Sequence, residues 1–236
     1  MTGDVNGELG GVVFDLDGVL LDSEPLHCRA IREVLSPLGV VFEDEEYATE
    51  LMGLDDRTLI PRACAMRGKE LDAATVERLA AAKTVALARI LAPGVDAFPG
   101  ALELLREAGD ALPVALCSGS RRVEIDLILQ GLGEDVPGRF VATVSADDVV
   151  RSKPDPAGYF KAVAALGLEP SACLAIEDTP TGTEAARAAG LFVVAVDNLG
   201  TPERLARANH VVSSLADVQL TDLYRWFARN AASDTF

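Results

Sequence analysis

The segment Val12–Leu20 reads VVFDLDGVL, and the prediction of the fold starts from it. It begins as an apolar run with the length of a buried parallel strand, too short for a buried helix. Residues two apart on a strand point the same way, and open α/β sheets bind ligands at the carboxyl ends of their strands. We therefore expect Asp15 and Asp17 to project together into a crevice. Gly18 allows the sharp turn that follows.

Downstream of this segment, short apolar runs alternate with helix-length segments over residues 95–215. The strand-length runs are Pro113–Cys117, Phe140–Val144, Cys173–Ile176, Leu191–Val196 and His210–Ser213. The helix-length segments are Ala101–Ala108, Arg122–Leu132, Pro156–Leu166 and Thr183–Ala189. This alternation predicts an α/β fold class with a doubly wound, Rossmann-like parallel sheet as its core.

Residues 24–94 lack this alternation and show only helical patterns. Glu24–Leu38 carries apolar residues at helical spacing, and Asp72–Leu91 is a long Ala-rich segment. The alternating pattern begins after Pro93-Gly94, a plausible hinge. We therefore predict a small α-helical cap domain at residues 24–94, inserted into a core domain made of residues 11–23 and 95–230. A loose leader occupies residues 1–10 in this interpretation.

The composition is that of a soluble globular protein, with 236 residues, 49% hydrophobic and 25% charged. Asp and Glu total 37 against 21 Lys and Arg, a formal net charge of −16. A chain this acidic repels nucleic-acid backbones and anionic lipid at long range, so we expect neither nucleic acid nor a membrane as a partner. No basic segment leads into an apolar signal, and no apolar run reaches the ~18 residues of a membrane span.

The cysteines predict a reducing environment rather than a metal site. Cys28, Cys64, Cys117 and Cys173 form no C-x-x-C pair, and the chain has only two histidines. We therefore expect no zinc site, and the thiols fit small core residues of a cytoplasmic protein. No heptad pattern indicates assembly, so we expect a monomer.

Asp15 and Asp17 also suggest a division of chemical roles. Two neighbouring carboxylates repel each other, which raises one pKa. A divalent cation on Asp15 would keep that residue ionised and leave Asp17 freer to carry a proton, so that one serves as nucleophile and the other as acid and base. The alternative is structural, because aspartate favours turns.

Polar residues follow three further predicted strands. Ser118-Gly119-Ser120 precedes a helix, where a hydroxyl and backbone N–H groups can hold an anion. Lys153 stands before a Pro-started helix, and Glu177-Asp178 offers two acids that suit a hard cation. Each has an ordinary alternative: a helix cap, a surface lysine, a pair of solvated acids. Their agreement at one sheet edge favours a phosphate site with a metal ion.

These segments, in this order and spacing, resemble the haloacid dehalogenase superfamily of phosphohydrolases and phosphomutases. The resemblance covers nearly the whole chain from about residue 11, and the helical insert is similar to the family's small cap. It implies that Asp15 attacks phosphorus, while Asp17 protonates the leaving oxygen and then activates water. It implies that Ser118 and Lys153 hold the phosphoryl oxygens, with Gly119 beside them.

The resemblance also implies the metal ligands. Mg²⁺ is held by Asp15, the backbone carbonyl of Asp17 and Asp178, with Glu177 nearby. The dehalogenases themselves typically lack the second aspartate, so Asp17 points to phosphoryl transfer. The resemblance is closest to β-phosphoglucomutase-like phosphatases, in which a histidine at the place of His27 is often linked to cap closure. A helix-surface histidine is the alternative for His27.

The cap distinguishes a phosphatase from a phosphomutase. Mutases of this group carry a cap arginine for a second phosphate, and Asp56 stands at that place here, with Arg57 one position later. Arg57 takes that place only if the loop shifts by one residue. Lys83 resembles a mutase cap lysine, and Arg121 is expected at the cap side of the crevice.

The resulting hypothesis is a Mg²⁺-dependent phosphatase acting on a small phosphorylated metabolite such as a sugar phosphate. The alternatives are a phosphomutase of the β-phosphoglucomutase type and a non-catalytic ligand-binding module on the same fold.

Overall fold

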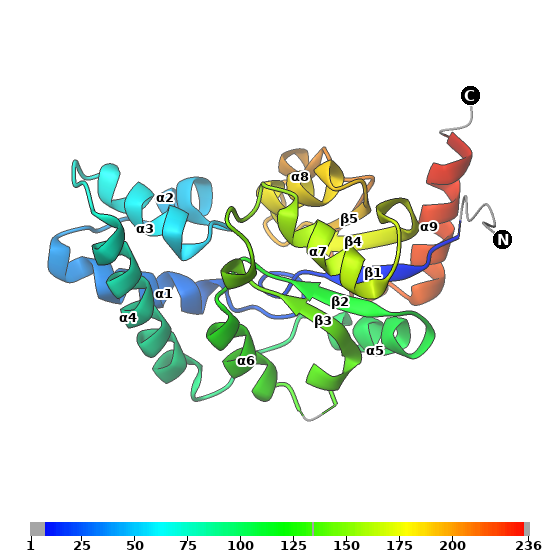
Figure 1. Cartoon of the computed structure of the whole chain (residues 1–236), viewed down its shortest axis with the longest axis horizontal. Helices are drawn as coiled ribbons and strands as arrows, with labels where there is room; N and C mark the ends of the chain where they lie inside the picture. Colours follow the sequence, from blue (N-terminus) through cyan, green and yellow to red (C-terminus); the bar gives the residue numbers. More distant parts are fainter. Residues whose placement is uncertain (1–7, 134, 234–236) are drawn as a thin grey trace.

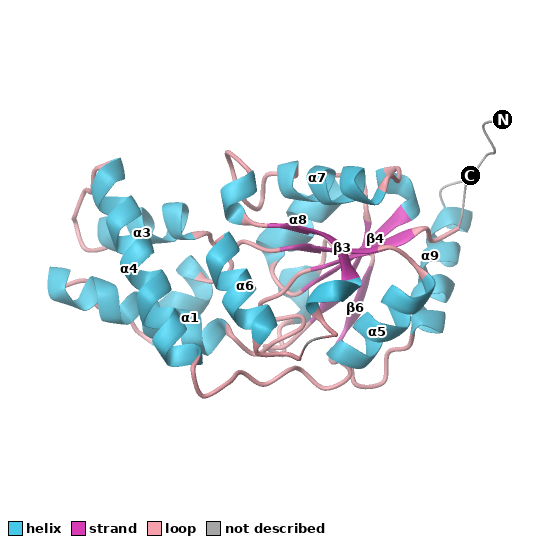
Figure 2. Ribbon diagram, turned by 60° about the horizontal axis from the view of Figure 1, so that its bottom comes forward, coloured by secondary structure: helices cyan, strands magenta, loops and turns pink. Residues whose placement is uncertain are grey.

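The computed structural model describes residues 8–133 and 135–233. Within these residues, six strands form one parallel sheet in the order β3-β2-β1-β4-β5-β6 (Figures 1 and 2). The strands are β1 (Gly11–Phe14), β2 (Val114–Cys117), β3 (Phe140–Val144), β4 (Cys173–Glu177), β5 (Phe192–Val196) and β6 (His210–Val212). The strand order reverses at β1, which lies between β2 and β4. The predicted doubly wound α/β fold is therefore confirmed.

The helices follow the predicted alternation, with three additions, α2, α3 and α9. They are α1 (Glu24–Leu35), α2 (Asp44–Glu46), α3 (Asp56–Ala65), α4 (Ala73–Leu91), α5 (Ala101–Ala111), α6 (Arg122–Gln130), α7 (Ala157–Leu166), α8 (Pro180–Ala188) and α9 (Leu220–Ser233). Short 3-10 segments are η1 (Ser36–Leu38), η3 (Pro137–Arg139), η4 (Ala146–Asp148), η5 (Pro170–Ala172) and η6 (Pro202–Leu205), and η2 (Tyr47–Leu51) is a π-helical turn. The sequence analysis did not delimit α2 or α3 within the helical insert and did not expect α9.

Helices cover both faces of the sheet (Figure 2). One face packs against α7 and α8 through small side chains and the fully buried Tyr159. The other packs against α5, α6 and α9 through larger apolar side chains such as Phe14, Leu105 and Ile125. Because strands β1, β2 and β4 are buried on both faces, they read as continuous apolar runs.

Helices α1 to α4 lie together at one end of the molecule, beyond the sheet (Figure 1). They enclose their own apolar cluster, which includes Ile31, Leu51 and Ile60. Helix α1 packs along α4, and α4 also contacts α6 of the sheet-bearing part. We call residues 24–94 the cap segment and the sheet-bearing remainder the core segment.

The predicted leader, residues 1–10, falls mostly outside the described residues. At its end, Leu9 is buried in the apolar cluster of the core segment. The backbone N–H of Gly10 donates to the carbonyl of Ala172 at 2.8 Å. These two residues therefore pack with the sheet, because they extend the line of strand β1.

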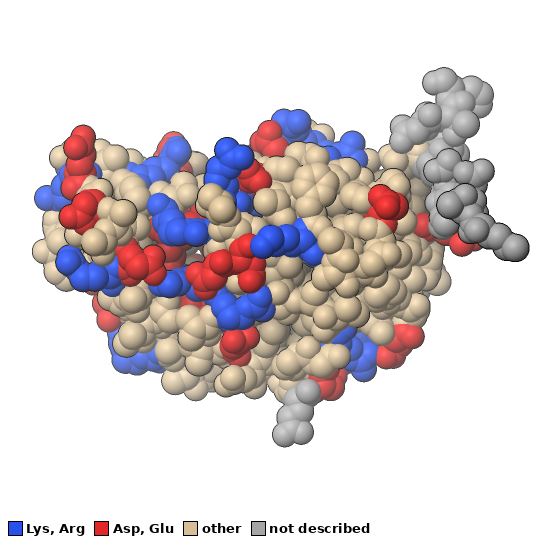
Figure 3. Space-filling model, viewed as in Figure 1, with Lys and Arg blue, Asp and Glu red and all other residues tan. Residues whose placement is uncertain are grey.

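Charged side chains of both signs lie next to one another on the face shown in Figure 3, most densely over the cap segment and its junction with the core segment. Ion pairs such as Arg121–Glu77 and Arg122–Asp148 join side chains of opposite sign. In the described part of the chain, no helix combines the length and apolarity that crossing a membrane requires.

Candidate active site

The site begins in the tight turn that follows β1. The backbone N–H of Asp15 donates to the carbonyl of Ile176 at 3.0 Å, which continues the ladder between β1 and β4 by one residue. Gly18 then adopts a φ of +82°, and a Cβ there would lie 1.9 Å from Asp178 Oδ2. Glycine is required here both for the backbone conformation and for the approach of Asp178. The two strand ends are thus held close together.

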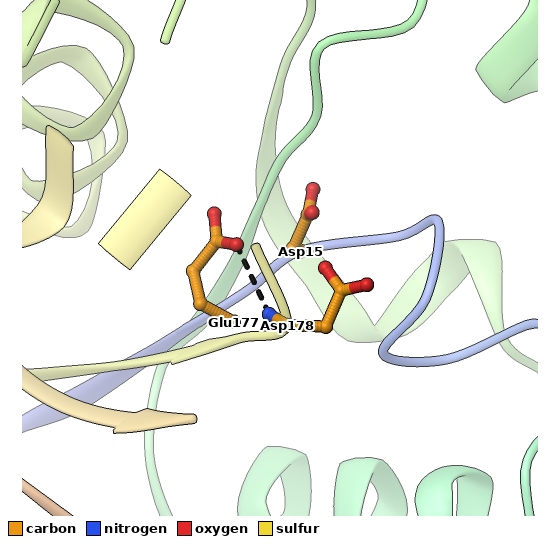
Figure 4. Close-up of side chains that lie close together, drawn as sticks. All are labelled: Asp15, Glu177 and Asp178. Atoms are coloured by element: carbon orange, nitrogen blue, oxygen red, sulfur yellow. Dashed lines mark hydrogen bonds between the residues drawn. The ribbon is translucent and has the colours of Figure 1, made fainter. Parts of the chain in front are cut away.

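Three carboxylates gather at this edge: Asp15, Glu177 and Asp178 (Figure 4). Each offers an oxygen that lies within 4.8 Å of the others. The ammonium of Lys153 lies 2.9 Å from Asp15 Oδ1 and 2.6 Å from Glu177 Oε1. The formal charge of the four side chains is −2.

Crowding and burial act strongly on these acids. Burial raises the pKa of Asp15 to about 8; Glu177 and Asp17 add to the rise, and Lys153 opposes it. Burial also raises the pKa of Asp178 well above its ordinary value, with Asp15 and Glu177 contributing. Asp178 Oδ1 accepts no hydrogen bond from any described residue. A buried, net negative set of oxygen donors with an unpartnered carboxylate oxygen fits a hard divalent cation.

Glu177 differs from the other two acids because its oxygens are occupied. Oε1 accepts hydrogen bonds from Lys153 and, at 2.5 Å, from the hydroxyl of Tyr159, and Oε2 accepts from the backbone N–H of Asp178. A Cβ on Gly182 of α8 would lie about 2.0 Å from Glu177 Oε1, so the helix closes over this side chain. Glu177 therefore orients Lys153, while Asp15 and Asp178 are the freer carboxylates.

Asp17 belongs to a separate network. Its Oδ1 accepts from Ser23 Oγ at 2.5 Å and lies 3.1 Å from His27 Nε2. Its Oδ2 accepts from Ser120 Oγ at 2.8 Å and from Ser118 Oγ at 3.2 Å. Burial opposes ionisation, but His27 and these hydrogen bonds outweigh it and hold the pKa of Asp17 below its ordinary range.

Asp15 and Asp17, which we expected to project into one crevice, do reach one pocket, but they contact different groups there. Strand β1 ends at Phe14, and the following backbone turns, so the two-residue alternation does not extend to Asp17. Both aspartates line the same pocket. Asp15 faces Lys153, whereas Asp17 faces His27 and the serine hydroxyl groups. The turn therefore separates the two carboxylates into different electrostatic environments.

The loop after β2 contributes Ser118, Gly119 and Ser120. Gly119 and Ser120 line the pocket; Ser118 does not, and both serines are buried. The hydroxyl of Ser118 accepts from the backbone N–H of Ser120 at 3.0 Å as well as donating to Asp17. Ser118 thus shapes the loop, and Ser120 presents the hydroxyl nearer the pocket.

The pocket, of about 50 Å³, lies between the two segments. Its core side carries Asp15, Asp17, Gly119, Ser120, Lys153 and Thr179, and its cap side carries Glu24, His27, Ile31, Tyr47, Gly53, Leu54, Asp56, Leu59 and Lys83. His27 is buried rather than on a helix surface. The cap segment therefore supplies the wall that faces the candidate nucleophile.

Lys83 is buried in this wall between two acids. Its ammonium donates to Glu124 Oε2 of α6 at 2.8 Å and lies 3.2 Å from Asp56 Oδ1. The hydroxyl of Thr84 donates to the other oxygen of Glu124 at 2.7 Å. The cluster joins α3 and α4 of the cap segment to α6 of the core segment.

Arg57 and Arg121, both expected at the substrate, do not line the pocket. Arg57 Nη2 donates to the carbonyl of Ala146 at 2.6 Å. Arg121 Nη2 donates to Glu77 Oε1 at 2.7 Å. Both guanidinium groups bridge the cap and core segments instead. Arg57 follows Asp56 by one residue of α3, and consecutive helix side chains point about 100° apart around the axis. Arg121 is held by the carboxylates of Glu77 and Asp147.

Sequence reasoning missed Ser23 and Glu124. A serine just before a helix reads as a cap, and Ser23 stands at the N-cap position of α1, yet its hydroxyl makes no capping bond and donates to Asp17. Glu124 reads as an exposed acid in the first turn of α6, yet it is fully buried. The signal for both residues lies in contacts across the pocket, which no local pattern encodes.

The family model of haloacid dehalogenase-like hydrolases matches residues 9–190. Protein CbbY of Rhodobacter capsulatus is 32% identical over 221 residues, which cover 92% of this chain and 94% of that protein. Fructose-1-phosphate phosphatase YqaB of Escherichia coli is 32% identical over 186 residues, 79% of this chain and 95% of that protein. The chain belongs to the haloacid dehalogenase-like hydrolases, which confirms the resemblance.

Solved structures agree on the fold. A β-phosphoglucomutase from Clostridium difficile matches with a TM-score of 0.86 at 24% identity, covering 95% of this chain and 99% of that chain. A mutant of CbbY from Rhodobacter sphaeroides, solved in complex with xylulose-(1,5)bisphosphate, matches with a TM-score of 0.82 at 26% identity, covering 91% of this chain and 99% of that chain.

Proposed function

We propose that this chain is a Mg²⁺-dependent phosphatase that hydrolyses a small phosphate monoester, a sugar phosphate, through an aspartyl phosphate on Asp15. The observation that carries the proposal is the separation of two pocket carboxylates. Asp15 lies among metal-binding acids and Lys153, and Asp17 lies among hydroxyl groups and His27. Two carboxylates in contrasting environments suit a nucleophile and an acid/base group.

In the first half of the proposed reaction, an Asp15 oxygen attacks phosphorus, and the bond from phosphorus to the ester oxygen breaks. Asp17 gives its proton to that oxygen as the alcohol leaves. In the second half, Asp17 takes a proton from water, the water oxygen attacks phosphorus, and Asp15 is released with inorganic phosphate. The hydrogen bonds around Asp17 favour its ionised form, which the second half of the reaction needs. The negative charge of an arriving phosphate raises the pKa of Asp17, so that it can carry the proton that the first half needs.

The remaining residues hold the phosphoryl group in line. Lys153 offers its ammonium beside Asp15, and the loop Ser118–Ser120 offers hydroxyl and backbone N–H groups. Asp15, Asp178 and the backbone carbonyl of Asp17 would hold Mg²⁺, with Glu177 orienting Lys153. A cation held there would neutralise charge on the phosphoryl oxygens and would keep Asp15 ionised.

The relatives support a sugar phosphate, since one is named a fructose-1-phosphate phosphatase and another was solved with a sugar bisphosphate. The separate apolar clusters support the division into a cap domain at residues 24–94 and a core domain at residues 11–23 and 95–230. The four buried, free cysteines support a cytoplasmic location. A monomer remains our proposal for the assembly.

A phosphomutase is the second candidate, favoured by the fold match to a β-phosphoglucomutase. Phosphate release from a panel of sugar phosphates with Mg²⁺ tests the two. In parallel, β-glucose 1-phosphate is supplied with glucose 1,6-bisphosphate as primer. We expect free phosphate from one or a few esters, its loss with EDTA and its return with Mg²⁺. Glucose 6-phosphate formed without free phosphate would identify a mutase, and activity indifferent to EDTA would contradict the metal site.

A further inference from the structure

The cap wall of the pocket contains one carboxylate oxygen with no partner among the described residues. Asp56 is the first residue of α3, and only 8% of its side chain is exposed. Its Oδ1 faces Lys83, but its Oδ2 accepts no hydrogen bond from any described residue, although Asp56 lines the pocket. A buried acceptor left without a donor is costly. A donor that enters the pocket is the natural partner for this oxygen.

The charge around this oxygen is negative. Asp56, Glu124 and Lys83 together carry a formal charge of −1, and the side chains of Lys83 and Glu124 are 4% and 0% exposed. Glu24 adds a further acid to the same wall. Buried charges are weakly screened, so an anion at this wall would meet strong repulsion.

Lys83 does not offset this repulsion for an incoming anion. Its ammonium already donates to Glu124 at 2.8 Å and lies 3.2 Å from Asp56, one acid from each segment. The other cations predicted for the cap side, Arg57 and Arg121, lie outside the pocket lining on carbonyl and carboxylate partners. The rest of the cap wall holds apolar Ile31, Leu54 and Leu59. Its two other polar groups are already engaged, since His27 lies 3.1 Å from Asp17 and the hydroxyl of Tyr47 donates to Glu24.

We propose that Asp56 is a specificity-determining residue that selects monophosphates over bisphosphates. Its Oδ2 accepts a hydrogen bond from a hydroxyl group at the end of the substrate away from the reacting phosphate. The negative charge of Asp56 and Glu124 disfavours substrates that carry a second phosphate at that end. This inference rests on the proposed function and names its substrate class: a hydroxylated small monophosphate.

The first test compares kcat/KM for a hexose 1-phosphate and the corresponding hexose 1,6-bisphosphate in the wild type, Asp56→Asn and Glu124→Gln. Both substitutions keep the side-chain shape and remove one negative charge. We expect the wild type to prefer the monophosphate, and Asp56→Asn to shift the ratio at least tenfold toward the bisphosphate. Glu124→Gln, which does not line the pocket, shifts it in the same direction by less. Glu50→Gln, an exposed cap acid paired with Arg62, is the control and leaves the ratio within twofold.

A second comparison tests the hydrogen bond. A monophosphate and its deoxy analogue, which lacks the hydroxyl group at the far end, are assayed with the wild type and with Asp56→Ala. The wild type should discriminate against the deoxy analogue more strongly than Asp56→Ala does. With this analogue bound, the wild type leaves the buried oxygen of Asp56 without a donor, whereas the variant has no such oxygen. Equal discrimination by both proteins, or an unchanged bisphosphate ratio in both Asp56→Asn and Glu124→Gln, overturns the proposal.

Binding separates this inference from the proposed function. Calorimetric titration measures how tightly each of the same two esters binds when no turnover occurs. It compares the Asp15→Asn variant with the double variant Asp15→Asn, Asp56→Asn. If no ester is hydrolysed by the wild type, the proposed function fails, while a ratio of dissociation constants that shifts with Asp56 still supports the selection. Thermal unfolding of each variant establishes that it is folded.

Discussion

Two buried lysines occupy matching positions on opposite walls of the pocket. Lys153 lies between Asp15 and Glu177, and Lys83 lies between Asp56 and Glu124. The acids that pair with Lys153 come from the core segment, whereas those that pair with Lys83 come from both segments. A further carboxylate, that of Asp178, and the hydroxyl of Tyr159 complete the first cluster. The same local chemistry thus builds the proposed reacting centre in one place and a wall between two segments in the other.

The largest expected effect falls on the reacting cluster. Asp15→Asn removes the proposed nucleophile with almost no change in shape, so we expect kcat for the best ester to fall by at least ~10³-fold. The measurement is steady-state phosphate release at saturating Mg²⁺. Glu50→Gln, in the cap segment, makes the same chemical change at an exposed pair and should keep wild-type kcat. A rate for Asp15→Asn near that of the control would contradict the covalent mechanism.

The two lysines can be compared directly. Lys153→Met and Lys83→Met each leave buried carboxylates unpaired, and we expect each to lower the free energy of unfolding by ~3 kcal/mol, as seen when one partner of a buried pair is removed. Urea unfolding measures this. Only Lys153 touches the candidate nucleophile, so kcat/KM should fall at least ~100-fold further in Lys153→Met than in Lys83→Met. Equal losses of activity would show that the two clusters do not differ in role.

The smallest effect concerns the contact between segments. Arg57 donates to the carbonyls of Ala146 and Val149 across the boundary. Arg57→Ala removes these bonds from a half-exposed side chain, and we expect KM to rise about three- to tenfold, since a hydrogen bond from a charged group contributes about 1 kcal/mol when partly exposed. Arg62→Ala, which breaks a pair with Glu50 inside the cap segment, is the matched control. A similar rise in both variants would mean that Arg57 acts only through cap stability.

Much of the fold was predictable because burial leaves a local record. Strands buried on both faces, such as Val114–Cys117, are continuous apolar runs, and the helices between them carry apolar residues at helical spacing. Helix α9 (Leu220–Ser233) follows the last strand and was not expected, although its Leu223 and Phe227 pack on the sheet. The limits of the two domains and the roles of the individual site residues stay predictions.

The amino-acid sequence alone was enough to establish the fold class, the family and the set of polar residues at the strand ends, because strand length, turn chemistry and motif order are local properties. The pairing of those residues emerged only in three dimensions. Asp17 accepts from Ser23 and lies against His27, and Glu124 turns inward to meet Lys83. A buried charge takes its partner from whatever the fold brings within ~4 Å, and that partner can lie anywhere along the chain.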